Sequence, residues 1–105
     1  MRPQLKVEFF LPSSYNSGED IEPKKIFFVK KEILAAFGGI STHPASVAGI
    51  WQGEDKVYYN NCYRFEVAAP KTDQTKEFFI LFKEKLKELF EQHEIYMTSV
   101  EMERF

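Results

Sequence analysis

The segment from Thr75 to His93 has the clearest hydrophobic pattern in the chain. Drawn at 100° per residue, its large apolar side chains fall within one arc of about 120°, and most of its charged residues fall outside that arc. The arc consists of Phe78, Phe79, Phe82, Leu86, Leu89 and Phe90. This pattern predicts an amphipathic helix that needs an apolar partner, with Thr72 or Asp73 as its N-terminal cap. Ile80 lies opposite the arc and is either a singly exposed apolar residue or, together with Phe28, part of a second contact surface.

A second helix is predicted from Lys24 to Phe37. Its apolar face, which Lys30 interrupts, consists of Ile26, Val29, Ile33, Leu34 and Phe37. Pro23 suits the first position of a helix, and a glycine pair at Gly38-Gly39 is a typical C-terminal stop. The run Ile26 to Val29 would by itself also suit a strand, and the glycine pair favours the helix.

Four further segments have the alternation or the composition of strands. They run from Leu5 to Leu11, from Val47 to Trp51, from Val57 to Ala68 and from Glu94 to Met102. Gly53-Glu54-Asp55 predicts a hairpin turn between the second and third of them. Asn60-Asn61 interrupts the alternation of the third strand, so we expect a bulge or a kink there. Ser13 to Glu22 is polar and predicts a loop.

The elements therefore follow the order βαββαβ. Two helices and four strands in this order predict an α+β fold, the ferredoxin-like sandwich. In that sandwich a four-stranded antiparallel sheet carries both helices on one face, and right-handed crossovers exclude most other topologies. The first and third strands are then neighbours in the middle of the sheet.

Composition limits the class of protein without identifying it. The 105 residues suit a single domain, residues 1–105, and 44% apolar and 16% aromatic content excludes disorder. The net charge of −2 provides no basic excess for phosphates, so we do not expect nucleic-acid binding. The sequence contains one cysteine and lacks the apolar runs of a signal peptide or a membrane span. We therefore expect a cytoplasmic protein that does not bind membranes.

Four short stretches resemble the landmarks of a group of small bacterial proteins. They are Gly38-Gly39-Ile40-Ser41, Gly49-Ile50-Trp51, Phe65-Glu66-Val67 and Phe90-Glu91-Gln92-His93-Glu94-Ile95. The proteins of that group are about 100 residues long, ferredoxin-like and functionally uncharacterised, and the resemblance covers roughly residues 5 to 103. It implies the fold and implies no activity, cofactor or site residue.

The sheet face turned away from the helices is the first candidate site. The alternation places Glu8 and Phe10 of the first strand on this face, beside Arg64 and Glu66 of the third. Tyr96 or Thr98 of the last strand is expected on the same face. This cluster is either a partner or ligand surface or a solvated face with weak ion pairs, and exposed aromatic residues on such faces often belong to dimer interfaces.

A second candidate cluster surrounds the predicted hairpin. It contains Trp51, Tyr59 and Asn61, which could grip a small molecule or line a pocket, although such residues are also ordinary at strand edges. His43 is expected in a loop, as a general base or as an ordinary exposed residue, and His93 is expected half-buried at a helix end. Cys62 has no nearby partner and is expected to be an inert thiol.

Metal and catalytic signatures are missing from the sequence, and no cofactor is expected. Two distant histidines and one cysteine lack the spacing of metal ligands, and no nucleophile, phosphate-loop or zinc-protease motif occurs. The first hypothesis is therefore a non-enzymatic binding module that contacts a protein partner or a second copy in a homodimer. The alternative is a small-molecule binder or cofactor-free enzyme resembling dimeric α+β barrels.

Overall fold

The structure of the chain is a computed structural model that describes residues 3–52 and 57–105, and for residues 44–52 and 57–61 it describes the backbone alone. The predicted turn Gly53–Asp55 lies outside the described residues. The elements follow the order β1 (Pro3–Pro12), α1 (Pro23–Phe37), β2 (Ser41–Gln52), β3 (Val57–Pro70), α2 (Asp73–Leu89) and β4 (Met97–Glu103). No described helix is long and apolar enough to cross a membrane.

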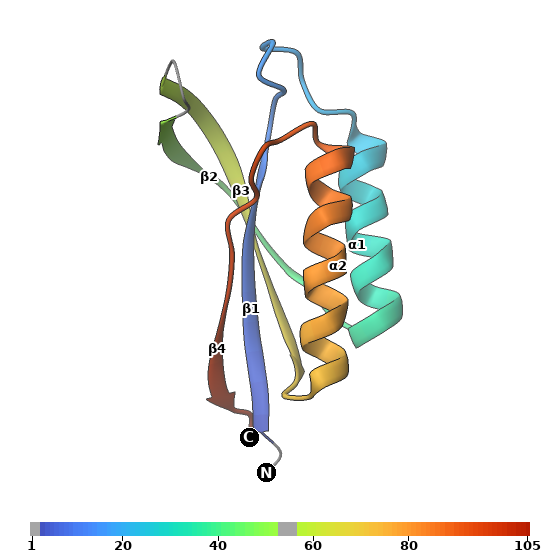
Figure 1. The fold of residues 1–105 in the computed structure, drawn as a ribbon. Coiled ribbons are helices and arrows are strands. Elements are labelled where there is room, and N and C mark those ends of the chain that lie inside the picture. Colours follow the sequence, from blue (N-terminus) through green and yellow to red (C-terminus); the bar gives the residue numbers. More distant parts are fainter. Residues whose placement is uncertain (1–2, 53–56) are drawn as a thin grey trace.

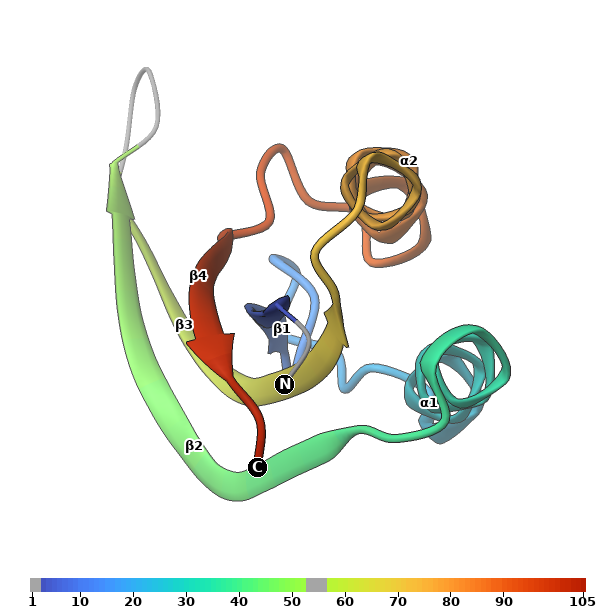
Figure 2. The same cartoon turned by 90° about the horizontal axis from the view of Figure 1, so that it is seen from below.

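The four strands form one antiparallel sheet in the order β2-β3-β1-β4. Both helices lie on the same side of this sheet (Figure 1). Viewed along the helices, the sheet is strongly twisted, and the β2–β3 pair curves away from the other strands (Figure 2). The predicted ferredoxin-like fold is confirmed, with β1 and β3 as central neighbours.

The core lies between the helices and the central strands. Phe9 of β1 stacks on Phe65 of β3 with ring centroids 5.3 Å apart, and Phe82 of α2 meets Phe9 edge-on. Every residue of the predicted arc on α2 is buried or packs against the core. Burying one such aromatic side chain stabilises a fold by roughly 1.5–3 kcal/mol, so this contact holds the helices on the sheet.

The helix ends follow the sequence signals. The Thr72 side-chain oxygen accepts a hydrogen bond from the Thr75 backbone N–H, which identifies Thr72 as the cap of α2. Gly38 has a left-handed backbone with φ of +81°, and its N–H donates to the Leu34 carbonyl at the end of α1. Leu34 itself corrects the predicted face of α1, because it is 49% exposed and only its backbone takes part in the cap.

Strand β2 differs from its prediction. It begins at Ser41 and not at Val47, so His43 lies in a strand and not in a loop. The register shifts between His43 and Val47, where β2 has two more residues than β3 opposite it. Pairing is continuous at Asn60-Asn61, and the bulge predicted there is wrong. Pro44 has no backbone N–H for the ladder, which explains an irregularity on this strand.

The chain after α2 also differs from its prediction. The helix ends at Leu89, and β4 begins only at Met97. Glu91 adopts a left-handed backbone with φ of +54°, a conformation that cannot continue an α-helix. His93 follows this break and is exposed, so the half-buried helical position predicted for it is wrong.

Candidate functional site on the open face of the sheet

The register of the two central strands brings together the four residues predicted for this face. Glu8 lies opposite Glu66, and Phe10 lies opposite Arg64. Their neighbours in sequence, such as Phe9, point to the helices, so these four side chains point to the reverse side. The predicted contact between the first and third strands is therefore present in the structure.

Arg64 is the centre of a polar network on this face. Its Nε lies 4.0 Å from Glu8 Oε2 and 3.9 Å from Glu66 Oε1. Its Nη2 lies 3.3 Å from His43 Nδ1, and His43 Nε2 lies 3.6 Å from Glu66 Oε1. His43 joins the network because β2 places it directly opposite Arg64. The network thus spans the three strands β1, β3 and β2.

The contact with Arg64 selects a tautomer of His43. A guanidinium group only donates hydrogen bonds, so His43 Nδ1 accepts, and the ring proton sits on Nε2, which faces Glu66. With His43 neutral, the network holds two carboxylates and one cation and carries a net charge of −1. An excess of one carboxylate over the cation favours contact with a cationic group.

An aromatic and apolar strip borders the network on the side of β4. The rings of Phe10 and Tyr96 lie 5.5 Å apart at an angle of 34°, and Tyr96 is 46% exposed. Thr98 pairs with Glu8, and Val100, which is 54% exposed, continues the same face. An acidic centre beside exposed aromatic and apolar groups suits a partner that offers both a cation and an apolar contact.

The residues predicted near the hairpin do not pair with the residues of the Arg64 network. Trp51 pairs with Tyr58, Ile50 pairs with Tyr59, and Ala48 pairs with Asn61 in a β2–β3 ribbon. That ribbon extends beyond Pro12 and Cys62, where the pairing of β1 with β3 ends. The side chains of Trp51, Tyr59 and Asn61 lie outside the described ones, so their predicted role stays a prediction.

Cys62 pairs with Pro12 at the end of the β1–β3 ladder. Its side chain is buried, and burial raises the pKa of its thiol. A thiol with a raised pKa holds little thiolate at neutral pH. This environment is that of an inert cysteine.

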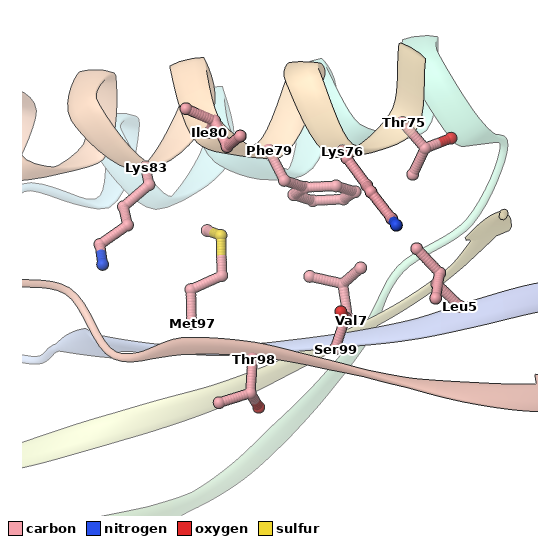
Figure 3. A pocket seen from close by; sticks show the side chains of 10 residues that line it. All are labelled: Leu5, Val7, Thr75, Lys76, Phe79, Ile80, Lys83, Met97, Thr98 and Ser99. Atoms are coloured by element: carbon pink, nitrogen blue, oxygen red, sulfur yellow. The ribbon is translucent and has the colours of Figure 1, made fainter. Parts of the chain in front are cut away.

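The structure contains a groove between α2 and β4 that the sequence did not predict. It encloses about 360 Å³, with Leu5, Val7 and Phe79 at its floor (Figure 3). The two lysines that line it, Lys76 and Lys83, reach from α2 toward the sheet. The signal that could have found it is a stripe on α2, because Lys76, Ile80 and Lys83 recur at helical spacing on one face.

Metal ligation has no support in the described part of the chain. No group of three or more histidine, cysteine, aspartate or glutamate residues there could hold a metal ion. On the open face, the guanidinium of Arg64 lies within 4.0 Å of both carboxylates. A cation would have to displace it.

Comparison with known proteins relates the chain to solved structures by its fold. No family model matches the sequence, and no curated protein matches it. The chain is similar to the divalent cation tolerance protein Cut A1 from Thermus thermophilus, with a TM-score of 0.64 and 12% identity over 97% of this chain and 86% of that one.

CutA1 from Ehrlichia chaffeensis, titled a divalent ion tolerance protein, is similar as well. It has a TM-score of 0.63 and 6% identity over 100% of this chain and 86% of that one. At such identities the likeness shows the fold alone. The chain therefore has the ferredoxin-like fold of CutA1 proteins.

Proposed function

We propose that this protein is a non-enzymatic binding module whose open sheet face contacts a protein partner. The observation that carries the proposal is the juxtaposition of the Arg64 network with the partly exposed Phe10 and the exposed Tyr96. Aromatic residues and arginine are the groups most often responsible for binding energy at protein interfaces. Regulators, inhibitors and small accessory subunits work by contact of this kind.

The simplest partner is a second copy of the chain in a homodimer. A two-fold interface presents the same patch twice, so each cation must find a carboxylate on the other copy. The composition of the patch is compatible with this condition, because it holds one cation, Arg64, and two carboxylates, Glu8 and Glu66. A different partner would need a basic side chain for the same carboxylates.

Sedimentation velocity over a range of protein concentrations tests this proposal. We expect a dimer in the wild type, and at least about tenfold weaker self-association in the double variant Phe10→Ala/Arg64→Ala. Lys6→Ala is the matched control, because Lys6 is exposed on the same face and outside the network. A strict monomer, or a double variant that dimerises like the wild type, would refute the homodimer.

The cofactor-free enzyme is not favoured by any specific observation. That hypothesis places some of the residues His43, Trp51, Tyr59 and Asn61 around a cavity between sheet and helices. Of these, His43 lies on the opposite face of the sheet beside Arg64. Divalent-cation tolerance, which the titles of the similar structures name, also lacks a ligand cluster in the described part of this chain. Contact with a protein remains the function that the geometry supports best.

A further inference from the structure

We propose that the free edge of β4 accepts an extended segment of a partner protein, whose alternate side chains enter the groove beneath α2. This site is distinct from the open face and does not depend on the function proposed for it. Three observations carry it: the character of the two sheet edges, the position of the groove, and the charge on its rim. Strand addition of this kind supplies main-chain hydrogen bonds along the edge and side-chain pockets beside it.

The two edges of the sheet differ in how far they resist pairing. Edge strands usually carry prolines, bulges or charges that discourage an added strand. On β2 the irregularity between His43 and Val47 and the proline at Pro44 do this. β4 pairs with β1 in a continuous register from Pro3–Glu103 to Phe9–Met97, and it contains no proline. Its first half, Met97 to Val100, also carries no charge.

The groove lies where the side chains of an added strand would arrive. Met97, Thr98 and Ser99 of β4 line it, and Met97 and Ser99, which pair with the buried residues Phe9 and Val7, face α2. A strand paired with β4 would direct every second side chain to the same side. The floor of the groove is the apolar core surface, and Ile80, which is 66% exposed, forms part of the wall that α2 provides. A small aliphatic side chain entering the groove would therefore cover Ile80 and Met97.

The rim of the groove selects an acidic partner. Lys83 is already paired with Glu94 at 2.9 Å, whereas Lys76 has no carboxylate within ion-pair distance in the described part of the chain. Lys76 lies near enough to Glu101 to contribute to the lowered pKa of that carboxyl, which is due first to its hydrogen bond with Lys71. The Lys76 ammonium group points from α2 toward the sheet (Figure 3). We therefore expect an acidic side chain opposite Lys76 and aliphatic ones along the floor.

A second copy of the chain is the other possible occupant of this edge. Lys76, unpaired among the described residues, and the uncharged run from Met97 to Val100 favour an acidic, aliphatic segment of a different protein, and self-association through β4 is the contrary outcome of the test.

The test uses a fluorescein-labelled, acetylated and amidated peptide, Glu-Thr-Val-Thr-Val-Thr, with the full-length protein. We expect a saturable rise in fluorescence anisotropy, and slower hydrogen exchange of the backbone amides of Met97 to Val100 in the bound state. A peptide of the same composition without the alternation, and one N-methylated at alternate amides, should each bind at least about tenfold more weakly. The second peptide probes the main-chain hydrogen bonds directly.

Charge reversal at Lys76 tests the rim. Lys76→Glu should weaken the peptide at least about tenfold, and Lys30→Glu, the same change on α1 at a different groove, should not. The variant Phe10→Ala/Arg64→Ala should bind the peptide like the wild type. Absence of saturable binding, equal binding by the N-methylated peptide, or protection of β4 amides by self-association alone would overturn the proposal.

Discussion

Phe9 and Phe10 are adjacent in the sequence and lie on opposite sides of the same strand. Phe9 is fully buried between Phe65 and Phe82, whereas Phe10 is partly exposed and meets Tyr96. The two residues are chemically identical, so the difference comes from what covers each face of the sheet. The helix side uses aromatic residues to stabilise the fold, and the open side holds them where a partner can reach them.

The largest effect that separates the two faces is expected from the pair Phe9→Ala and Phe10→Ala. Removing Phe9 leaves a cavity in a closely packed core and should lower the free energy of unfolding by about 3–5 kcal/mol. Removing Phe10 should cost less than about 1 kcal/mol, because its side chain is partly solvated already. Urea denaturation followed by circular dichroism measures both.

An equal decrease in the free energy of unfolding for these two variants would contradict the difference between the two faces. They would mean that Phe10 contributes to the stability of the monomer as much as the core does. The measurement should be made at a protein concentration where the wild type is monomeric, since self-association would add to the apparent stability of Phe10.

The second effect concerns the glycine that ends α1 and so helps to place a helix on the covered face. Gly38→Ala should lower the free energy of unfolding by about 1–2 kcal/mol, because a Cβ is strained at its φ of +81°. Nothing lies within 4 Å of that Cβ, so the cost is one of backbone conformation alone. Gly39→Ala is the matched control, since its φ is not in the left-handed region, and it should be close to neutral.

The features that the sequence predicts well are those that depend on local patterns or on the order of the elements. The core of α2 is predictable because Phe79, Phe82 and Leu86 repeat at the helical period, and periodicity is a local property. The meeting of Glu8 with Arg64 is predictable as well, since the order of elements fixes which strands are central. These two inferences use only the periodicity within one element and the order of the elements in the chain.

Other features depend on details that no local pattern contains. The position of His43 follows from where β2 starts, and Ser41 to Pro44 has the composition of a loop, so the sequence does not indicate a strand there. The groove beside Lys76 arises from the separation between α2 and β4, which depends on the packing of both against β1. The likeness to CutA1 structures at 12% identity or less is likewise visible only in three dimensions.

The third effect is a pH dependence located on the helix side. Lys83 and the backbone N–H of Ile95 hold the pKa of Glu94 below its usual value of 4.5. A lowered pKa in the folded state means that this carboxylate stabilises the fold above pH 4.5, and that the stabilisation is lost as the pH falls through the lower, folded value.

The variant Glu94→Gln should therefore reduce the acid sensitivity of the melting temperature between about pH 5 and pH 3. Glu94 is exposed, so the contribution of its ion pair to the free energy of unfolding should be smaller than the loss expected for Gly38→Ala. Thermal scans of both proteins across this range measure it. If the two proteins lose stability in parallel as the pH falls, the ion pair with Lys83 does not contribute.

The smallest effect on stability is expected for the ion pair at the centre of the open face. Its small size distinguishes the open face from the face that the helices cover. Arg64 Nε and Glu66 Oε1 lie 3.9 Å apart, beyond hydrogen-bond distance, and the two side chains are 38% and 25% exposed, so their attraction is weak in the monomer. A double-mutant cycle with Arg64→Ala and Glu66→Gln, followed by urea denaturation of the monomer, should give a coupling below about 1 kcal/mol.

The same cycle followed through self-association should give a larger coupling, because an interface excludes the water that screens the pair in the monomer. Glu88→Gln on α2 provides a control for loss of a carboxylate at an exposed position away from this face. A coupling of several kcal/mol in the monomer would assign the network to stability, and the open face would then resemble the covered one. A coupling that appears only on association would assign it to binding.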